Sequence, residues 1–183
     1  MSGSHPRVVL VGPMGAGKST VGELLASSWG TALRDTDRDV EDREGRPISE
    51  IFVDRGEKYF RDLEREAVAE ALATHDGVLA LGGGSVLDPD TRAALKGHTV
   101  VFLHVGLSDA VKRVGLGTAR PLLLGNVRAR IKALLDERLP IYREVATVTV
   151  ETDGRTAEEV AAEVREQVER LEGGPTAAHE EER

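Results

Sequence analysis

The chain has 183 residues, 40% of them hydrophobic, which suits one compact domain because a single core rarely stops growing below roughly 250 residues. Its 24 basic and 32 acidic residues leave a formal charge of −8, which repels polyanions, so we expect no nucleic acid and no anionic membrane as partner. The absence of cysteine excludes thiolate metal sites and cysteine nucleophiles and fits a reducing compartment. No apolar run approaches the roughly 20 residues of a membrane span, and we expect a cytoplasmic monomer.

Short apolar runs alternate with segments of helical period, as in βαβ units around a largely parallel sheet. We predict five strands, at residues 8–11, 32–35, 78–81, 100–105 and 147–150. Apolar residues from Val21 to Trp29 recur at the spacing of a helix that follows the first strand. The predicted fold class is therefore α/β, with three α/β/α layers around a five-stranded parallel sheet.

A glycine-rich loop joins the first strand to this helix. Residues 12–19, Gly-Pro-Met-Gly-Ala-Gly-Lys-Ser, match the P-loop pattern G-x-x-x-x-G-K-[ST] at every specified position. Backbone N–H groups at such a helix start bind phosphate oxygens, so the loop predicts ATP binding. Lys18 is expected to bridge the β- and γ-phosphates, and Ser19 to present its hydroxyl to Mg²⁺. The predicted nucleotide-binding residues of the loop are Gly15, Ala16, Gly17, Lys18, Ser19 and Thr20.

Two acids follow the second predicted strand. Asp35 and Asp37 lie at its carboxyl end, where open parallel sheets bind their ligands. We expect Asp35 to order a metal-bound water and Asp37 to reach an acceptor hydroxyl. The third strand ends in Gly82-Gly83-Gly84 rather than in a Walker B aspartate, and no N-K-x-D guanine signature occurs. This pattern favours a kinase over an ATPase or a GTPase.

Two stretches interrupt the alternation of strands and helices. The first, residues 37–61, is dense in charge and is punctuated by Gly45-Arg46-Pro47 and Gly56. The second, about residues 115–125, begins with Gly115 and Gly117, which give it backbone freedom. We predict a substrate-binding insertion and a lid, both within a single domain over residues 1–172. Residues 173–183 have no apolar period, and we expect a disordered tail there.

Two helix starts are marked in the second half of the chain. Asp88 precedes Pro89, and an N-cap acceptor before a proline predicts a helix over about residues 89–96. Thr156 and Glu159 form a capping box. The helix that follows is expected to carry one apolar stripe made of Val160, Val164, Val168 and Leu171.

Six segments together resemble the shikimate kinase family in order and spacing, and the similarity covers about residues 7–170. They are GPMGAGKST at 12–20, DTD at 35–37, FR at 60–61, GGG at 82–84, RPLL at 120–123 and ERLPIY at 137–142. The resemblance implies a kinase of the nucleoside-monophosphate-kinase fold. It further implies transfer of the ATP γ-phosphoryl group to the 3-hydroxyl of shikimate, a step in aromatic amino acid precursor synthesis.

The resemblance also implies roles for individual residues. Arg61 and Arg138 would bind the substrate carboxylate, for which the planar guanidinium is suited. Asp37 and the glycine turn 82–84 would bind the hydroxyls, and Asp37 would also take the proton of the attacking oxygen. Arg120 in the lid would act in catalysis by stabilising charge on the transferring phosphoryl group and would contact the nucleotide. Arg155 matches a position near the adenine.

Two alternative functions remain open from the sequence. A kinase for gluconate or for a nucleoside monophosphate keeps the same P-loop, but the glycine turn combined with Arg61 and Arg138 argues against it. A nucleotide-binding sensor or scaffold would bind ATP without turnover. The acid Asp37, the lid arginine and the two carboxylate-binding arginines argue against it, because they all occupy positions that phosphoryl transfer to an acceptor requires. Phe52 and Phe60 are interpreted equally as core residues or as walls of the substrate site.

Overall fold

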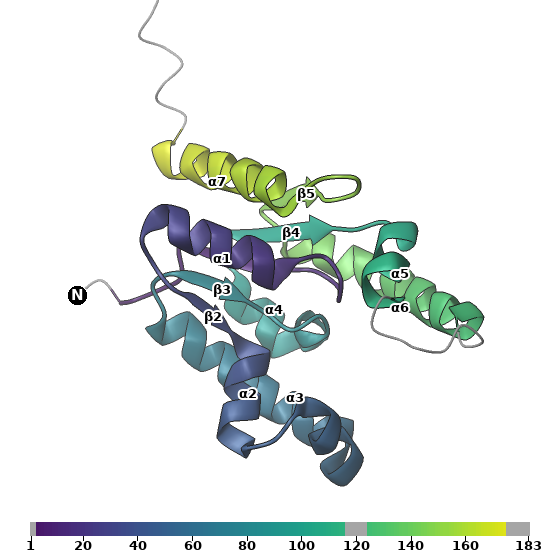
Figure 1. The fold of residues 1–183 in the computed structure, drawn as a ribbon. Helices are drawn as coiled ribbons and strands as arrows, with labels where there is room; N and C mark the ends of the chain where they lie inside the picture. Colours follow the sequence, from purple (N-terminus) through teal and green to yellow (C-terminus); the bar gives the residue numbers. More distant parts are fainter. Residues whose placement is uncertain (1–2, 116–123, 175–183) are drawn as a thin grey trace, which may run out of the picture.

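The computed structural model describes residues 3–115 and 124–174. Strands and helices alternate along most of this part of the chain, as Figure 1 shows. The elements are β1 (Val8–Val11), α1 (Lys18–Trp29), β2 (Leu33–Asp35), α2 (Thr36–Glu44), α3 (Ile48–Thr74), β3 (Val78–Ala80), the 3₁₀ helix η1 (Ser85–Leu87), α4 (Pro89–Leu95), β4 (Val100–His104), α5 (Leu107–Gly115), α6 (Leu124–Val145), β5 (Val148–Glu151) and α7 (Ala157–Gly173).

The five strands form one parallel sheet in the order β2-β3-β1-β4-β5. This confirms the predicted α/β sheet, and each strand begins and ends within one residue of its predicted bounds. The central strand β1 is buried along its whole length. Strands covered on both faces read as continuous apolar runs, which is why the inner strands β1, β3 and β4 were recognisable in the sequence.

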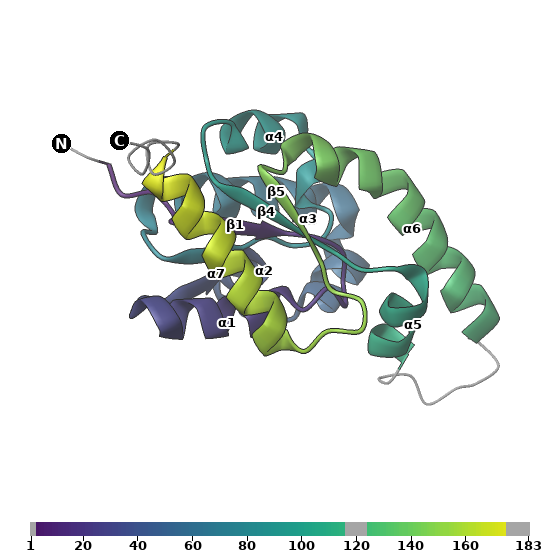
Figure 2. The same cartoon turned by 90° about the horizontal axis from the view of Figure 1, so that it is seen from above.

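Helices cover both faces of the sheet and complete the three layers. Alternate residues of a strand point to opposite faces, so Val8 and Leu10 pack with α1 and α7, whereas Val9 and Val11 pack with α3, α4 and α6. Figure 2 shows α1 and α7 on one side of the sheet and α4 and α6 on the other. The described residues contain no helix that is both long and apolar enough to cross a membrane.

The predicted helix starts are borne out by their caps. The Asp88 carboxylate accepts hydrogen bonds from the backbone N–H groups of Asp90 and Thr91 at the start of α4. The Thr156 hydroxyl accepts from the N–H of Glu159 at the start of α7. The stripe of α7 was predicted one turn too long: Leu171 is 47% exposed, because the sheet ends before the last turn of the helix.

The charged stretch after β2 is helical. It forms α2 and the first half of α3, which extend away from the sheet (Figure 1) and bury a small apolar cluster of their own around Val40, Ile51 and Phe60. Inside α3, Gly56 has φ 84° and ψ 170°, a conformation open essentially to glycine alone. With its own apolar cluster and the change of direction at Gly56, this segment packs as a unit beside the sheet.

Candidate active site

The predicted site residues gather at the carboxyl edge of the sheet. The P-loop follows β1, Asp35 ends β2, and the glycine turn 82–84 follows β3. Because β2, β3 and β1 are parallel neighbours, their carboxyl ends meet at one edge. This edge is where open α/β sheets bind ligands.

The P-loop holds its lysine in a half-buried position. Lys18 Nζ donates to the backbone carbonyls of Gly12 at 2.6 Å and Pro13 at 3.0 Å. Burial lowers the pKa of Lys18 to about 8, although the carboxylates of Asp37 and Asp35 oppose the shift. Binding of an anion next to this partly desolvated ammonium would strongly stabilise its charged form.

An oxygen-lined cavity of about 280 Å³, the loop cavity, opens beside this lysine. Its wall includes Ser19, Asp35 and Asp37. The Ser19 hydroxyl donates to Asp35 Oδ2 at 3.4 Å, and Asp35 Oδ1 accepts from the N–H of Asp37 at 2.9 Å as the N-cap of α2. Among the described residues no three His, Asp or Glu side chains cluster to hold a metal. A hydroxyl with one nearby carboxylate instead fits Mg²⁺, which is bound by few protein ligands and keeps several waters.

A second and larger cavity of about 430 Å³, the arginine cavity, lies between the P-loop, α2, α3 and α6. It brings together Asp37, Arg61, Gly83, Gly84 and Arg138, all of which were candidates from the sequence. Its apolar walls include Phe60, which also belongs to the small cluster under α2. Phe52 packs against that cluster and on Phe60, with ring centroids 4.9 Å apart, and does not line the cavity.

The glycine turn is packed against the three polar side chains of this cavity. A Cβ atom at Gly82 would lie 2.5 Å from Asp37 Oδ1, and one at Gly84 would lie 2.5 Å from Arg61 Nη2. At Gly83 a Cβ would lie 3.5 Å from Arg138 Nη1. A side chain at Gly82 or Gly84 would therefore displace the Asp37 carboxylate or the Arg61 guanidinium from its present position.

Glu64 is a residue of the site to which the sequence interpretation assigned no role. It is only 3% exposed, and its Oε1 accepts from Arg61 Nη1 at 2.8 Å. Burial raises the pKa of Glu64, while the hydrogen bond and charge of Arg61 lower it. The available signal was the spacing of three residues from Arg61, which places both side chains on one face of a helix.

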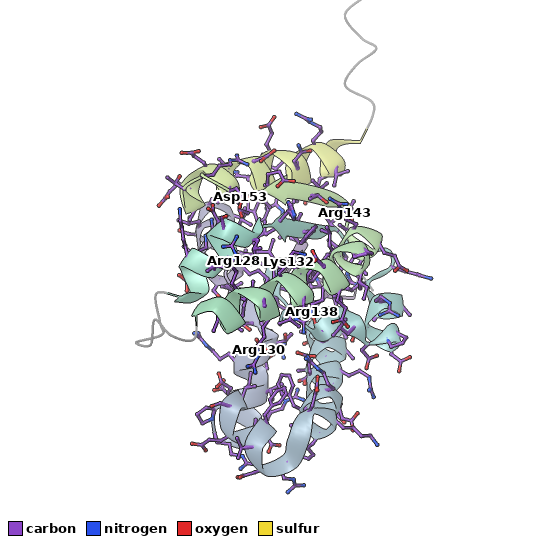
Figure 3. The ribbon with its side chains drawn as sticks, turned by 90° about the vertical axis from the view of Figure 1, so that its right-hand side faces the viewer. Arg128, Arg130, Lys132, Arg138, Arg143 and Asp153 are labelled. Carbon is purple, nitrogen blue, oxygen red and sulfur yellow. The ribbon has the colours of Figure 1, made fainter. Side chains whose placement is uncertain are left out.

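Arg138 reaches the arginine cavity from α6, and Figure 3 shows it on the side of this helix that faces α2 and α3. Its Nε is the one buried side-chain nitrogen or oxygen within the described part of the chain that has no hydrogen-bond partner. A buried donor without an acceptor costs free energy. The guanidinium is therefore ready to receive an anionic group in the cavity.

Asp37 lines both the loop cavity and the arginine cavity. Burial raises the pKa of Asp37, and the neighbouring Asp35 carboxylate raises it further, while Lys18 lowers it. The carboxylate is thus a stronger base than an exposed aspartate. It stands where a group bound to one cavity would meet a group bound to the other.

A third cavity of about 280 Å³, the Arg155 cavity, lies on the other side of the P-loop helix start. Arg155 lines it beside Ala16, Gly17 and Thr20 and pairs with Glu163. Arg113 also lines it and donates to the Gly15 carbonyl at 2.7 Å. No motif in the sequence marked Arg113.

The predicted lid and its Arg120 fall within residues 116–123, outside the described residues. The structure therefore gives positions for the other candidate residues of the site but not for Arg120, and the roles of all of them stay predictions.

The sheet order, the P-loop after β1 and the paired cavities define a P-loop nucleotide-binding protein with a small-molecule site at the sheet edge. The shikimate kinase family model matches residues 14–169. The chain is 64% identical to a shikimate kinase of Salinispora arenicola, over 87% of this chain and 95% of that relative, and 61% identical to one of Thermobifida fusca, over 86% and 92%. The chain belongs to the shikimate kinase family, a family of phosphotransferases.

The fold is likewise similar to that of solved shikimate kinases. The structure of shikimate kinase from Acinetobacter baumannii in complex with shikimate has a TM-score of 0.84 and 35% sequence identity to this chain. The match covers 94% of this chain and 96% of that one. The prediction of the family and of its fold is confirmed.

Proposed function

We propose that this chain transfers the γ-phosphoryl group of ATP to the 3-hydroxyl of shikimate, giving shikimate 3-phosphate and ADP. The observation that carries the proposal is the position of Asp37, which lines both the P-loop cavity and the arginine cavity. A hydroxyl of a molecule held by the arginines would lie beside the carboxylate and next to the phosphates held by the loop. Family membership and the shikimate complex of the Acinetobacter relative support the same acceptor.

The arginine cavity suits a small hydroxylated carboxylate. Arg138 and Arg61 offer guanidinium groups that bind a carboxylate through two parallel charge-assisted hydrogen bonds. Arg61 is held by Glu64, and Arg138 keeps a buried Nε without a partner. The hydroxyls of the ring would be bound by Asp37 and by backbone groups of the glycine turn, which is open to the cavity at Gly83 and Gly84.

Phosphoryl transfer then needs one new bond and one broken bond. The 3-oxygen of shikimate attacks the γ-phosphorus, the bond from that phosphorus to the β–γ bridging oxygen of ADP breaks, and the hydroxyl proton passes to Asp37. Its raised pKa suits it to accept that proton. Lys18 would stabilise the charge on the β- and γ-phosphates, which is the larger contribution in a reaction that depends mainly on positioning and charge.

The remaining roles complete the nucleotide site. Ser19, and Asp35 through a water, would hold Mg²⁺, which neutralises phosphate charge when bound. Arg155 would contact the adenine, and Arg120 would stabilise the transferring phosphoryl group. The cytoplasmic location and the monomeric state stay predictions; light scattering after size-exclusion chromatography measures the latter.

A product assay tests the proposal directly. The purified chain is supplied with ATP and Mg²⁺ and with shikimate, gluconate, a nucleoside monophosphate or no acceptor, and ADP release is measured together with the ³¹P NMR spectrum of the product. We expect ADP release and a new phosphomonoester signal with shikimate alone. Full activity with another acceptor would overturn the proposal, and ATP binding without any product would favour the sensor alternative.

A further inference from the structure

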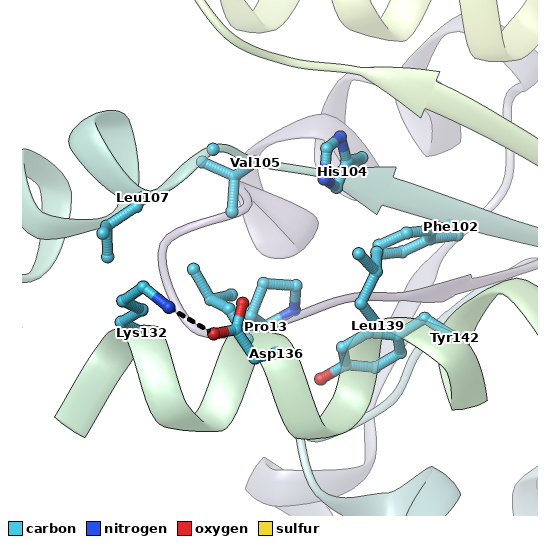
Figure 4. Close-up of a pocket in the computed structure, with 11 residues that line it drawn as sticks. Pro13, Phe102, His104, Val105, Leu107, Lys132, Asp136, Leu139 and Tyr142 are labelled. Atoms are coloured by element: carbon cyan, nitrogen blue, oxygen red, sulfur yellow. Dashed lines mark hydrogen bonds and ion pairs between the residues drawn. The ribbon is translucent and has the colours of Figure 1, made fainter. Parts of the chain in front are cut away.

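Tyr142 is a buried titratable residue that the mechanism above does not use. It is 1% exposed and is the largest of the fully buried side chains in the described part of the chain. Its ring stacks on Phe102 of β4, with centroids 4.9 Å apart and planes inclined by 19°. Figure 4 shows the two rings beside a cavity of about 170 Å³ between α6 and β4, distinct from the arginine cavity.

The hydroxyl of Tyr142 donates a hydrogen bond to the backbone carbonyl of Gly83 at 2.5 Å. In a planar trans peptide the carbonyl and the following N–H point in opposite directions, so the N–H of Gly84 points away from Tyr142. Gly83 and Gly84 line the arginine cavity, and Tyr142 does not. The hydroxyl therefore sets which polar group of this peptide is presented to the cavity.

The N–H groups of the turn differ in their partners. The N–H of Gly82 donates to the Thr36 hydroxyl at 3.4 Å. No acceptor among the described residues receives the N–H of Gly83 or of Gly84. Two donors at the edge of the cavity are thus left for a ligand, and the peptide that carries one of them is oriented from behind by Tyr142.

Tyr142 also lies one helical turn after Arg138 on α6. Burial raises the pKa of Tyr142, and the charge of Arg138 beside it lowers that pKa in part. The phenol therefore stays protonated at neutral pH and remains a donor. One residue of the core contacts the backbone of the turn and neighbours the guanidinium that faces the same cavity.

We propose that Tyr142 is a positioning residue for shikimate, acting through the Gly83–Gly84 peptide so that the Gly84 N–H is aimed at a substrate hydroxyl. The inference rests on the proposed function. A phenylalanine would fill the same space and keep the stack on Phe102. What the tyrosine hydroxyl adds is a hydrogen bond that fixes the orientation of the Gly83–Gly84 peptide. A buried hydroxyl is tolerated in an apolar core only when it is hydrogen-bonded.

Tyr142→Phe removes this hydroxyl, which also lies beside Arg138, and the chain provides a matched control. Tyr59 is the other tyrosine, and its hydroxyl donates to Glu44 Oε1 at 3.0 Å, away from the glycine turn. We expect Tyr142→Phe to raise KM for shikimate about threefold to tenfold, the worth of one neutral hydrogen bond. The kcat and the KM for ATP should stay within about twofold of the unmutated chain. Tyr59→Phe should leave all three constants unchanged.

A second measurement uses the free protein and needs no substrate. In ¹H–¹⁵N spectra of ¹⁵N-labelled protein, the amide signal of Gly84 should shift or broaden in Tyr142→Phe and not in Tyr59→Phe. An unchanged KM for shikimate, whatever the spectrum, overturns the positioning role and leaves Tyr142 a core residue. A raised KM with an unchanged Gly84 signal overturns the route through the Gly83–Gly84 peptide.

The two measurements also separate this inference from the proposed function. If the unmutated chain does not phosphorylate shikimate, the proposed function fails, and the positioning role for shikimate fails with it. The Gly84 signal then still tests the orienting contact itself. If the unmutated chain turns over shikimate and Tyr142→Phe behaves identically, only the inference fails.

Discussion

The two halves of the candidate site are built in opposite ways. The phosphate-binding groups of the P-loop come from one run of nine residues, 12–20, and are backbone amides, one ammonium and two hydroxyls. The arginine cavity takes its polar groups from four distant segments, which are α2, α3, the glycine turn and α6. The first half is a local structure that would form wherever a strand meets a helix in this way. The second exists only once the chain is folded.

This difference implies different consequences of substitution. A change in the loop alters the phosphate charge balance that every turnover requires, and it should reduce kcat whatever the acceptor. A change in the cavity alters the recognition of the acceptor and should appear mainly in KM for shikimate. The predictions below test that division, from the largest expected effect to the smallest.

The largest effect is expected from Lys18→Met. The substitution removes the only ammonium of the loop, and loss of one charge-stabilising donor at a transition state costs about 10³-fold in kcat. Because the lysine pKa is lowered by burial, its charged form is disfavoured in the folded protein, so the variant should unfold at an equal or higher temperature. Steady-state kinetics and thermal unfolding check both parts. A variant that keeps kcat and loses only affinity for shikimate would contradict the assignment of the P-loop to catalysis and of the arginine cavity to acceptor binding.

Arg138→Lys should have the next largest effect. Lysine keeps the charge but lacks the planar fork that binds a carboxylate through two bonds, and one charge-assisted hydrogen bond is worth about a tenfold to hundredfold change in affinity. We expect KM for shikimate to rise by that factor with a much smaller change in KM for ATP. Arg143→Lys is the matched control, since Arg143 is exposed on the same helix. Equal effects of the two variants would contradict the assignment.

The same contrast explains how much could be predicted from the sequence. The three inner strands β1, β3 and β4 were found because they are buried almost throughout and read as apolar runs, and the P-loop was found because its residues are contiguous. Asp37, Arg61 and Arg138 were placed by resemblance to a family, since no periodicity links residues so far apart. Within the insertion at residues 37–61, the helix α2 was not predicted, because it has only one apolar residue, Val40, to mark its buried side.

The residues that were missed depend on tertiary contacts. Glu64 matters because it is buried against Arg61, and Tyr142 because its hydroxyl meets a carbonyl 59 residues away. Spacing places Glu64 near Arg61 on one face of a helix, but it gives neither the burial of Glu64 nor the distant partner of Tyr142. The prediction that Leu171 belongs to the buried stripe of α7 was wrong for a related reason, because the helix continues past the sheet that would have covered this residue.

Glu64→Asp is expected to have a moderate effect. The charge is kept, but the carboxylate is withdrawn by one methylene from Arg61 Nη1, which it now meets at 2.8 Å. A loosened Arg61 should raise KM for shikimate about threefold to tenfold, less than Arg138→Lys, because no group that contacts the substrate is removed. Asp62→Asn on the same helix, which affects only the pair with Arg65, is the control and should leave the kinetics unchanged. A fall in kcat as large as that of Lys18→Met would place Glu64 in the chemistry rather than in acceptor binding.

The smallest effect is a pH dependence that should separate the two halves without any substitution in the cavity. The lysine pKa of about 8 lies below that of a free lysine, so the ammonium is present below pH 8 and is lost as the pH rises through 8. Between pH 7 and 8.5 the charged fraction falls about fourfold, and KM for ATP should rise by about the same factor. KM for shikimate should stay flat over this interval, because the arginines that bind the carboxylate remain charged.

Lys18→Arg supplies the control for that titration. Its guanidinium does not lose its proton in this range, so whatever activity the variant retains should show no rise in KM for ATP between pH 7 and 8.5. A rise that persists in Lys18→Arg would assign the titration to another group. A parallel rise in KM for shikimate in the unmutated chain would mean that the two halves share a titrating residue. Asp37 is then the group to test, because it is the one carboxylate that lines both cavities.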